Sequence, residues 1–511
     1  MAELYLGVAR ARVGPAAALV DLERASIAAC EENRLTRARH TPTAGPPALA
    51  VAELLSFITR SPADIGAVGI VDNETGLWDS GTPSRPVDGH QAHAAYAFHA
   101  SGFPEAVVLV SEVHKPRGWS AWRYATAAGE PRSIADGLGD FPLARIYGQL
   151  TEALGFQPMR DEHMVEAMAR GGADSATVVA DQISLTDDGV IVDPRFAATI
   201  REKLASASDE RSKRDIAASV QRRLGDCLVE LLKRIGSPTS APSFGRLCLS
   251  GGLFFNTFFT TIARTAKVFD DVYVPPHPGR NGTALGAALL VGASHQSALG
   301  GCAASPYLGP GYSDDEIKEA LDNCKLSYDF QPGDRLNETV IQALSRGRLI
   351  GWFHGRLEWG PRALGHRSVL ADPFAPHVLE NLNGFLKRRP WYRSYGVSVP
   401  LARVDEWFES NASSNRSPFM QFEYRPRDPQ RFRTILPAGV ETLRVHTVDD
   451  AEPRFLRLLE MWGEKTGAPV LVNTSFNGFH EPLVCSPRDA IRVFYGTGLD
   501  VLALEDFLLR K

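Results

Sequence analysis

Cysteine is scarce in this sequence, and its six residues form no motif. They are spread from Cys30 to Cys485, and no Cys-x-x-Cys pair occurs among them. Disulfide-stapled extracellular domains and zinc ribbons both need closely spaced cysteines. The dispersed pattern is typical of free thiols in a reducing compartment, so we expect a cytoplasmic protein.

Long apolar runs and a secretory leader are also missing. A membrane span needs about 18 consecutive apolar residues, and no such stretch occurs. The segment Met1–Tyr5 contains Glu3 where a signal peptide carries positive charge, and no apolar segment follows it. We therefore expect neither a secretion signal nor contact with a membrane.

Lysine is the third scarce residue. Lys and Arg total 55, but only ten of these are lysine, and the formal net charge is −5. A negative net charge argues against a dedicated nucleic-acid binder. Arginine binds phosphate and carboxylate through two hydrogen bonds at once. GC-rich codon usage and selection for anion binding would both produce this ratio, and composition alone leaves the two explanations open.

The remaining composition is that of an ordinary soluble globular protein, with 44% hydrophobic and 23% charged residues. At about 150 residues per domain, the length predicts two to four packing units. Three short apolar runs open the chain, at Leu4–Ala9, Ala16–Asp21 and Ile27–Glu31, and are typical of strands. Strand and helix patterns then alternate, which predicts an α/β fold.

The chain divides into two units by the same patterns. Residues 293–335 are loop-like, and a helix–strand pattern resumes near Leu336. We therefore expect a first unit at residues 1–300, a connector at 301–335 and a second unit at 336–511.

Two glycine-rich turns in the first unit each stand between a strand and a helix. One contains Gly251 and Gly252, and the other runs from Gly279 to Gly282. Such a turn directs backbone N–H groups and the positive end of a helix at one point, which suits a phosphate. A glycine at the end of a strand is also a common turn former, so either turn alone is weak evidence. Together they favour a nucleotide clamp of the actin and sugar-kinase type.

A histidine-rich stretch lies between the first strands and these turns. His90 and His93 stand three positions apart, so on a helix they would share a face and could bind a metal. His99 and His114 follow. Histidines near the start of a helix also cap or hydrogen-bond the backbone, and this structural role is as well supported as metal binding.

The second unit contains the densest basic sequence, from Gly355 to Pro373. Glycine and proline separate its arginines, and a further basic run with Trp391 and Tyr392 follows. A solvated basic surface would not need these interleaved residues, so we expect a shaped cavity whose guanidinium groups converge on phosphate. The basic residues are Arg356, Arg362, Arg367, Lys387, Arg388, Arg389 and Arg393. Asn473 and Ser475 follow an apolar strand and suit polar contacts to a nucleotide or a small amide.

These motifs resemble the ATP-dependent carbamoyltransferases of nodulation-factor and antibiotic tailoring. The resemblance covers nearly the whole chain and includes long C-terminal blocks. It rests on Glu31–His40, Leu247–Asn256, Gly282–Leu289, Gly355–Pro373, Ser417–Met420 and Val472–Pro487. It implies an N-terminal actin/sugar-kinase-like domain related to threonylcarbamoyltransferases and a C-terminal YrdC-like α/β domain.

The resemblance implies that the second unit condenses carbamoyl phosphate with ATP, accompanied by Mg, to give carbamoyl adenylate. Arg362, Lys387, Arg393, Arg444, Asn473 and Ser475 match the family's positions for these two substrates, and Arg356 and Arg367 join them in our assignment. Two polyanions repel each other, so fixed cations are needed to bring them together. The first unit would hold the adenylate through Gly251, Gly252, Asn256, Gly279, Asn281 and Gly282.

The first unit departs from the family pattern at its iron-type metal site. Gly89 stands where relatives have the first of three histidines, and Arg280 stands where they have an aspartate. The family's Glu-Gly-Lys turn here begins at Glu162 and continues with His163, and its N-terminal His-Asp pair is replaced by Gly14-Pro15. Arginine is permanently protonated and cannot ligate a metal.

Three consequences of these departures stay open. Arg280 supplies the positive charge that the metal would give; or a relocated metal site forms from His90, His93, Glu112 and His114; or the first unit no longer catalyses transfer. The first is the most economical. His93 or His114 would then be the general base, beside Arg280, Arg362 and Arg393 as catalytic residues.

The leading hypothesis is a carbamoyltransferase acting on a hydroxyl or amine of a small natural-product acceptor in secondary metabolism. A partial enzyme that only makes carbamoyl adenylate, or a non-catalytic partner of an active paralogue, is the alternative. A third reading, a tRNA-modifying enzyme, is disfavoured by the net charge of −5. We expect no nucleic-acid or membrane partner, and a homo-oligomer is among the open expectations.

Overall fold

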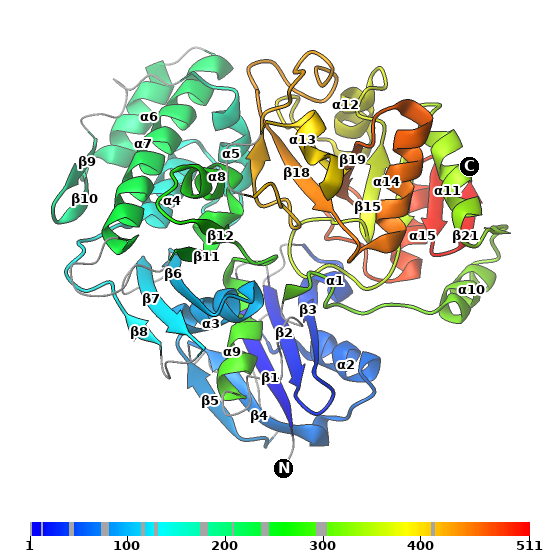
Figure 1. Cartoon of the computed structure of the whole chain (residues 1–511), viewed down its shortest axis with the longest axis horizontal. Helices are drawn as coiled ribbons and strands as arrows, with labels where there is room; N and C mark the ends of the chain where they lie inside the picture. The colour runs from blue at the N-terminus through cyan, green and yellow to red at the C-terminus, as the bar shows by residue number, and fades with distance from the viewer. Residues whose placement is uncertain are drawn as a thin grey trace.

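The computed structural model describes residues 3–11, 14–39, 45–72, 81–113, 118–126, 131–173, 182–206, 209–236, 245–292, 304–409 and 414–511. Strands and helices alternate along these ranges, so the expected mixed α/β class is confirmed. Figure 1 shows the C-terminal part, in yellow to red, beside the blue-to-green remainder of the chain.

The first part of the chain is built on two five-stranded sheets with the same strand order. The first sheet contains β3 (Ser26–Glu31), β2 (Gly14–Asp21), β1 (Leu4–Ala11), β4 (Ile65–Val71) and β5 (Ser84–Val87) in this order. The second contains β8 (Arg132–Ser133), β7 (Trp119–Ala125), β6 (Glu105–Ser111), β11 (Arg246–Ser250) and β12 (Asp271–Tyr273). In each sheet three antiparallel strands are followed by two parallel ones. This doubled arrangement agrees with the actin and sugar-kinase type expected from the glycine turns.

Two helices join these sheets. Helix α9 (Thr283–Val291) packs on β1, β2 and β4, and helix α3 (Gly89–Ser101) packs on β6 and β11. The helices also pack on each other at close range, because a Cβ atom at Gly286 would lie 1.9 Å from the carbonyl oxygen of Ala92. Likewise, a Cβ atom at Gly7 would lie 1.8 Å from the carbonyl oxygen of Ala284. Glycine at these two positions lets α9 approach both neighbours.

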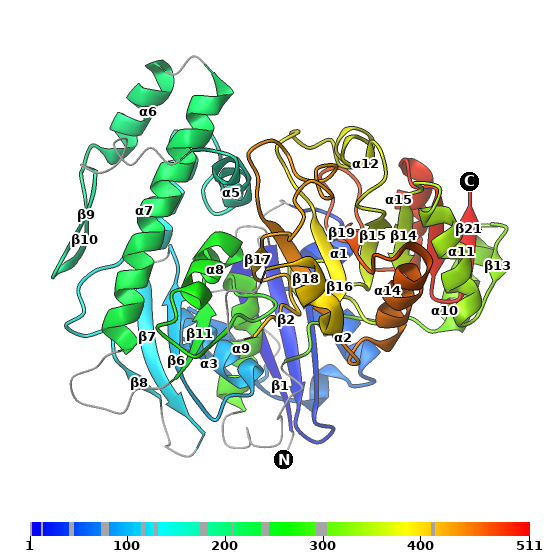
Figure 2. The ribbon, with the colours of Figure 1, turned by 45° about the horizontal axis from the view of Figure 1, so that its top comes forward.

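A helical layer covers the outer part of the second sheet. It consists of α4 (Leu143–Ala153), α5 (Glu162–Arg170), α6 (Phe196–Ser206), α7 (Glu210–Gly236) and α8 (Thr257–Thr265), with a hairpin of β9 (Ile183–Thr186) and β10 (Gly189–Val192). The long helix α7 packs against α4, α5, α6 and α8. Figure 2 shows it from a second side with α5, α6 and α8 near it. Shorter elements near the first sheet are α1 (Glu32–Thr36), α2 (Ala48–Phe57), η1 (Pro62–Asp64) and η4 (Arg280–Gly282), whereas η3 (Gly252–Phe255) packs on β6 and β11 of the second sheet.

The C-terminal part is built on one mixed sheet of nine strands. Their order is β13 (Asp329–Phe330), β21 (Phe507–Arg510), β20 (Val501–Leu504), β14 (Ile350–Phe353), β15 (Arg367–Ala371), β19 (Leu471–Ser475), β16 (Gly396–Pro400), β18 (Leu443–Val448) and β17 (Glu423–Tyr424). The helical segments around it are α10 (Asp314–Asn323), α11 (Asp334–Leu344), α12 (Val378–Glu380), the π-helical η7 (Asn381–Lys387), η8 (Leu401–Arg403), α13 (Val404–Trp407), α14 (Pro453–Thr466) and α15 (Pro487–Gly496).

The three opening strands were predicted correctly, but the expected loop at residues 293–335 was wrong in part. Residues 314–323 form helix α10, which begins with a capping box between Ser313 and Glu316. The Ser-x-x-Glu signal for a helix start was present in the sequence and outweighs the surrounding Gly and Pro. Residues 293–303 lie outside the described part of the chain. Within the described residues, no helix is long and apolar enough to cross a bilayer.

Candidate functional site

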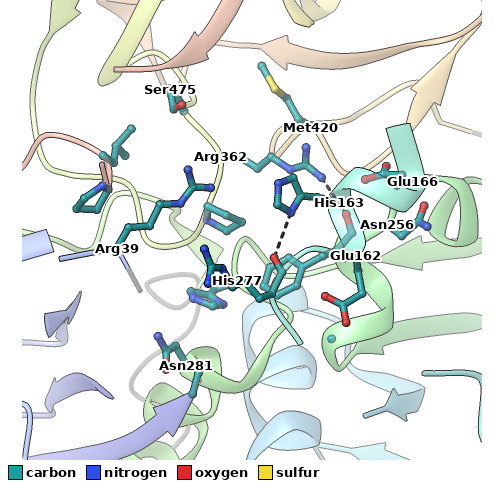
Figure 3. Close-up of a pocket in the computed structure, with 18 of the residues that line it drawn as sticks. Arg39, Glu162, His163, Glu166, Asn256, His277, Asn281, Arg362, Met420 and Ser475 are labelled. Atoms are coloured by element: carbon teal, nitrogen blue, oxygen red, sulfur yellow. Dashed lines mark hydrogen bonds between the residues drawn. The ribbon is translucent and has the colours of Figure 1, made fainter. Parts of the chain in front are cut away.

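One cavity of ≈ 400 Å³ opens between the two sheets of the first part and the nine-stranded sheet. Figure 3 shows its walls, with Asn281 and His277 on one side and Ser475 and Met420 on the other. Side chains separated by more than 400 positions in the chain therefore meet here. Both glycine-turn segments and the basic segment contribute residues to its lining.

The wall from the first part is held by short polar contacts at the ends of strands. Gly252 donates its N–H to Glu112 Oε1 at 2.6 Å. Asn256 caps helix α8 through its Oδ1 and donates from Nδ2 to Tyr147 Oη at 3.0 Å, so its amide orientation is set. Asn281 lies in η4 beside Glu31. Gly252, Asn256, Arg280 and Asn281 thus line the cavity, whereas Gly251, Gly279 and Gly282, also predicted for this role, do not belong to the lining.

The remaining glycines shape the turns rather than the wall. Gly251 has a φ of 105°, and a Cβ atom there would lie 2.1 Å from the carbonyl oxygen of Ser111. Only glycine fits this close approach between β11 and β6. The sequence-predicted turn is therefore present, and its effect on a ligand is through the position of Gly252.

The wall from the C-terminal part carries five of the expected residues. They are Arg362, Arg393, Arg444, Asn473 and Ser475. Arg362 donates from Nη2 to the carbonyl oxygen of Phe255 at 2.9 Å, which ties it to the first part. Burial, together with nearby Arg389, lowers the pKa of Arg393 to about 9. A guanidinium still charged at neutral pH but poorly solvated is a strong attractor for an anion.

Three other basic side chains predicted for the site are engaged elsewhere in the protein. Arg356 donates to the carbonyl oxygens of Gly309, Ile27 and Leu308. Arg367 is fully buried, donates to the carbonyl oxygen of His354 at 2.7 Å and lies over the ring of Phe353. Neither arginine belongs to the cavity lining.

Lys387 stands directly behind the wall. Its ammonium group donates to the carbonyl oxygen of Asn477 at 3.1 Å and to Asn477 Oδ1 at 2.6 Å, and it also contacts the carbonyl oxygen of Ser475. Burial and the charges of Arg389, Arg39 and Arg393 lower its pKa well below the usual range. Lys387 therefore holds the strand end that presents Ser475 and Asn477 to the cavity.

A buried ion network connects the two parts beside the cavity. Glu166 accepts from Arg170 Nη2 at 2.8 Å and from Thr257, and Arg444 Nη1 lies 3.8 Å away. Glu423 completes the network by pairing with Arg170 at 2.6 Å. Burial alone would raise the pKa of Glu166, but the guanidiniums of Arg170, Arg444 and Arg362 outweigh it and lower the pKa to about 2. Glu166 thus stays ionised among the anion-binding arginines.

We expect acid to weaken the fold through Glu166 and Glu31. Burial opposes ionisation of Glu31, but Arg34 and His277 lower its pKa to about 2, as Arg170 does for Glu166. Both carboxyls have an ordinary value of 4.5, so the stability they add is fully present above that pH and is lost as the pH falls toward 2. Each shift corresponds to about 3 kcal/mol of the free energy of unfolding. Urea unfolding at several pH values between 7 and 3 measures this loss of stability. In Glu31→Gln the free energy of unfolding should depend less steeply on pH. Equal free energies of unfolding at pH 6 and pH 3 in the unaltered protein would contradict the prediction.

Several cavity residues were not assigned by sequence reasoning. They are Arg39, Arg160, Glu162 and His163, and Arg389 of the predicted basic run lines the cavity beside them. Arg39 and Arg389 belong to stretches that the sequence singled out, but nothing in their spacing indicated that they meet. Burial and the nearby Arg389 and Arg34 lower the pKa of Arg39 to about 10. The cation set on the wall is therefore larger than the sequence suggested.

His90 and His93 of α3 each contact a serine hydroxyl. His90 Nδ1 lies 2.8 Å from Ser120 Oγ, and His93 Nδ1 lies 3.0 Å from Ser250 Oγ. His93 Nε2 lies 3.3 Å from Glu112 Oε1, and the ring is buried. His93 is not part of the cavity lining, and His114 lies outside the described residues. Among the residues that the structure describes, no three His, Cys, Asp or Glu side chains gather as metal ligands.

The positions implied for a family metal do not fit one in this chain. Arg280 donates from Nη1 to Asp72 Oδ2 at 2.8 Å and from Nε to the carbonyl oxygen of Arg10. Asp72 in turn accepts the N–H of Gly89 at 2.7 Å, and a Cβ atom at Gly89 would lie 2.8 Å from its carboxylate. A histidine at position 89 would therefore displace Asp72, and a cation stands at position 280.

The sequence is similar to carbamoyltransferases and nodulation proteins. Residues 83–289 match the family model "Carbamoyltransferase N-terminus", and residues 341–511 match "Carbamoyltransferase C-terminus". The nodulation protein NolO of Bradyrhizobium diazoefficiens is 31% identical over 444 residues, which cover 83% of this chain and 78% of that protein. A 3′-hydroxymethylcephem-O-carbamoyltransferase of Amycolatopsis lactamdurans is 27% identical over 298 residues, 57% of this chain and 54% of that protein. Among solved structures, HypF of T. kodakarensis superposes with a TM-score of 0.37 at 12% identity, over 58% of this chain and 48% of HypF.

Proposed function

Given that the chain belongs to the carbamoyltransferase family whose two models it matches, we propose that it moves a carbamoyl group from carbamoyl phosphate, through ATP-derived carbamoyl adenylate, to a small-molecule acceptor. The observation that supports this most is the shared cavity. Its walls bring Arg362, Arg393 and Arg444 within one space with the glycine-turn residues Gly252 and Asn281. A reaction between two polyanions and a third molecule needs such a convergence.

The C-terminal wall suits formation of the adenylate. Water first cleaves the oxygen–phosphorus bond of carbamoyl phosphate, which gives carbamate and inorganic phosphate. A carbamate oxygen then attacks the α-phosphate of ATP, and the β- and γ-phosphates leave as pyrophosphate. Negative charge builds up on the α-phosphate during this step, and fixed guanidiniums stabilise it without reorganising. Mg²⁺ would accompany ATP as part of the co-substrate. Asn473 and Ser475, at the end of β19, are placed to orient the small amide.

The first-part wall suits transfer from the adenylate. Gly252 and the side chain of Asn281 line the cavity at two strand-to-helix turns, the kind of turn that binds a phosphate. Arg280 also lines the cavity and carries a permanent charge. We propose that this charge takes the place of a metal ion in neutralising the adenylate phosphate. Asp72 holds the Arg280 guanidinium in position for that role.

A second function is favoured by the same departures at Gly89 and Arg280. The protein would then form carbamoyl adenylate and pass it to another protein, or support an active paralogue, without transferring the carbamoyl group itself. Under either function, we propose that the final acceptor of the carbamoyl group is a small-molecule natural product. We also propose that the protein is cytoplasmic.

The test measures both half-reactions on purified protein supplied with carbamoyl phosphate, ATP and Mg²⁺. We expect AMP and pyrophosphate, and, when hydroxylamine is added as a trap, ATP-dependent N-hydroxyurea. A mixture without ATP is the control, because carbamoyl phosphate decomposes to cyanate, which also reacts with hydroxylamine. An iron-selective chelator such as 2,2′-bipyridyl should leave both rates unchanged.

Each contrary outcome has its own meaning. Absence of carbamoyl-phosphate-dependent AMP would contradict adenylate formation. AMP, pyrophosphate and N-hydroxyurea without transfer of the carbamoyl group to a small-molecule hydroxyl or amine would favour the partial enzyme. Loss of N-hydroxyurea on adding the chelator would overturn the role given to Arg280.

A further inference from the structure

His163 is a cavity residue for which the reaction above has no use. It is the second residue of helix α5, and its ring lines the cavity together with Glu162 from the same helix turn. Figure 3 shows the imidazole pointing into the space enclosed by the two parts. The other described histidine on this wall, His277, lies 3.4 Å from Glu31 Oε1 through its Nε2. His163 Nε2, by contrast, has no carboxylate partner among the described residues.

The tautomer of His163 follows from a single contact. Its Nδ1 lies 3.2 Å from the carbonyl oxygen of Arg160. A carbonyl oxygen can only accept a hydrogen bond, so Nδ1 carries the proton. Nε2 of the neutral ring then holds a lone pair and is the atom able to take up a proton. The backbone turn before α5 thus sets the ring up as a proton acceptor.

The charges around the ring keep it neutral until an anion binds. Burial lowers the pKa of His163 well below its usual range, and Arg393, Arg39 and Arg389 lower it further, against the opposing charge of Glu166. Arg39 comes from the segment after α1, and Arg389 and Arg393 from the segment after η7. The same three guanidiniums line the cavity that would hold the phosphate groups. Bound phosphate would neutralise them and so strengthen the basicity of Nε2.

His93, which the sequence predicted as the general base, and its neighbour His90 are differently placed, and the other predicted base, His114, lies outside the described residues. His93 is 1% exposed, lies against Ser250 and Glu112, and does not line the cavity. His90 is tied through Nδ1 to Ser120 and is also absent from the lining. A general base must come within hydrogen-bond reach of the proton it removes. Of His90, His93 and His163, only the last faces the space where an acceptor could lie.

We propose that Nε2 of His163 accepts the proton of the attacking hydroxyl during carbamoyl transfer; this rests on the function proposed above. The proton passes from the acceptor oxygen to Nε2 while that oxygen forms a bond to the carbamoyl carbon. The bond from the carbamoyl carbon to the adenylate oxygen breaks, and AMP leaves with its electron pair. The imidazolium then returns its proton to water. Because bound anions raise the basicity of the ring, the base becomes active once the adenylate is in place.

Nuclear magnetic resonance of the full chain labelled with ¹³C,¹⁵N-histidine tests the geometry without any acceptor. His163→Gln assigns the His163 signal. We expect the Nδ1-protonated tautomer, a ring that stays neutral well below pH 6.5, and an upward shift of its pKa by about one unit or more when inorganic pyrophosphate is added. The Nε2-protonated tautomer, or a pKa that pyrophosphate leaves unchanged, would overturn the proposal.

Kinetics of the same variant test the chemical role. Hydroxylamine attacks through a neutral lone pair and needs no base, whereas water must lose a proton. In His163→Gln we expect the rate of ATP-dependent N-hydroxyurea formation to stay within about twofold of that of the unaltered protein. The rate of AMP release with water as the only acceptor should fall about 100-fold, and this rate should no longer depend on pH. His377→Gln, which changes an exposed histidine, should alter neither rate.

The outcomes distinguish a failure of the role proposed for His163 from a failure of the proposed carbamoyltransferase function. If the unaltered protein makes neither product, the proposed function fails and the role of His163 falls with it. If it makes both products and His163→Gln keeps its water reaction within twofold, or loses both reactions by the same factor, only the His163 proposal is overturned.

Discussion

Replacing Arg362 by alanine is expected to lower carbamoyl-phosphate-dependent formation of AMP and pyrophosphate by about 10²–10³-fold. Arg362 lines the cavity beside Arg393 and Arg444, and its hydrogen bond to the carbonyl oxygen of Phe255 fixes the direction of its guanidinium. Loss of one preoriented cation facing developing phosphate charge removes about 3–4 kcal/mol of transition-state stabilisation. The measurement is the initial rate of AMP formation at saturating ATP.

Two further variants make this result specific. Arg362→Lys keeps the charge but loses the two-pronged geometry, so we expect an intermediate rate. Arg403→Ala removes an exposed arginine that pairs with Glu406 and should leave the rate unchanged. Full activity in Arg362→Ala, or an equal loss in Arg403→Ala, would show that the cavity is not the adenylate-forming site.

Replacing Glu166 by glutamine is expected to lower the free energy of unfolding by about 3–5 kcal/mol. The carboxylate is buried and lies among Arg170, Arg444 and Arg362, so its removal leaves buried positive charge that Glu423 compensates only in part. The network also joins the two parts of the fold through Glu423. Urea unfolding at pH 7 measures the loss, and inorganic pyrophosphate should restore part of it because the anion supplies the missing charge.

The control for this variant is an exposed ion pair of the same type. Glu406→Gln breaks the pair with Arg403, whose partners are 45% and 51% exposed, and should cost less than about 1 kcal/mol. Equal losses in the two variants, or no response of Glu166→Gln to pyrophosphate, would contradict the role of Glu166 as counter-charge of an anion site.

Local patterns in the sequence predicted the elements well. The three opening strands were correct because their apolar runs end at polar or Gly and Pro breaks. The two glycine turns were located because a strand pattern precedes each of them and a helix pattern follows it. Helix α10 was missed although Ser313 and Glu316 form a capping box, since the Pro- and Gly-rich residues before it dominated the interpretation.

The identity of the cavity residues was harder to predict because residue type does not reveal what a side chain faces. Arg356 and Arg362 stand six positions apart in one basic segment, yet the first binds backbone carbonyls and only the second lines the cavity. Arg39, Arg160 and His163 come from other segments and reach the same wall through tertiary packing. The resemblance to a family assigned positions that keep its motifs. Arg160 belongs to none of them, and His163 stands where the family's Glu-Gly-Lys turn has glycine.

The central claim is that this cavity activates a carbamoyl group by joining it to AMP. Exchange of labelled pyrophosphate into ATP tests it most directly, because exchange requires reversible formation of an enzyme-bound adenylate. We predict exchange only when carbamoyl phosphate is supplied, with Arg403→Ala equal to the unaltered protein and Arg362→Ala at background. No exchange, or exchange of the same rate without carbamoyl phosphate, would contradict the account.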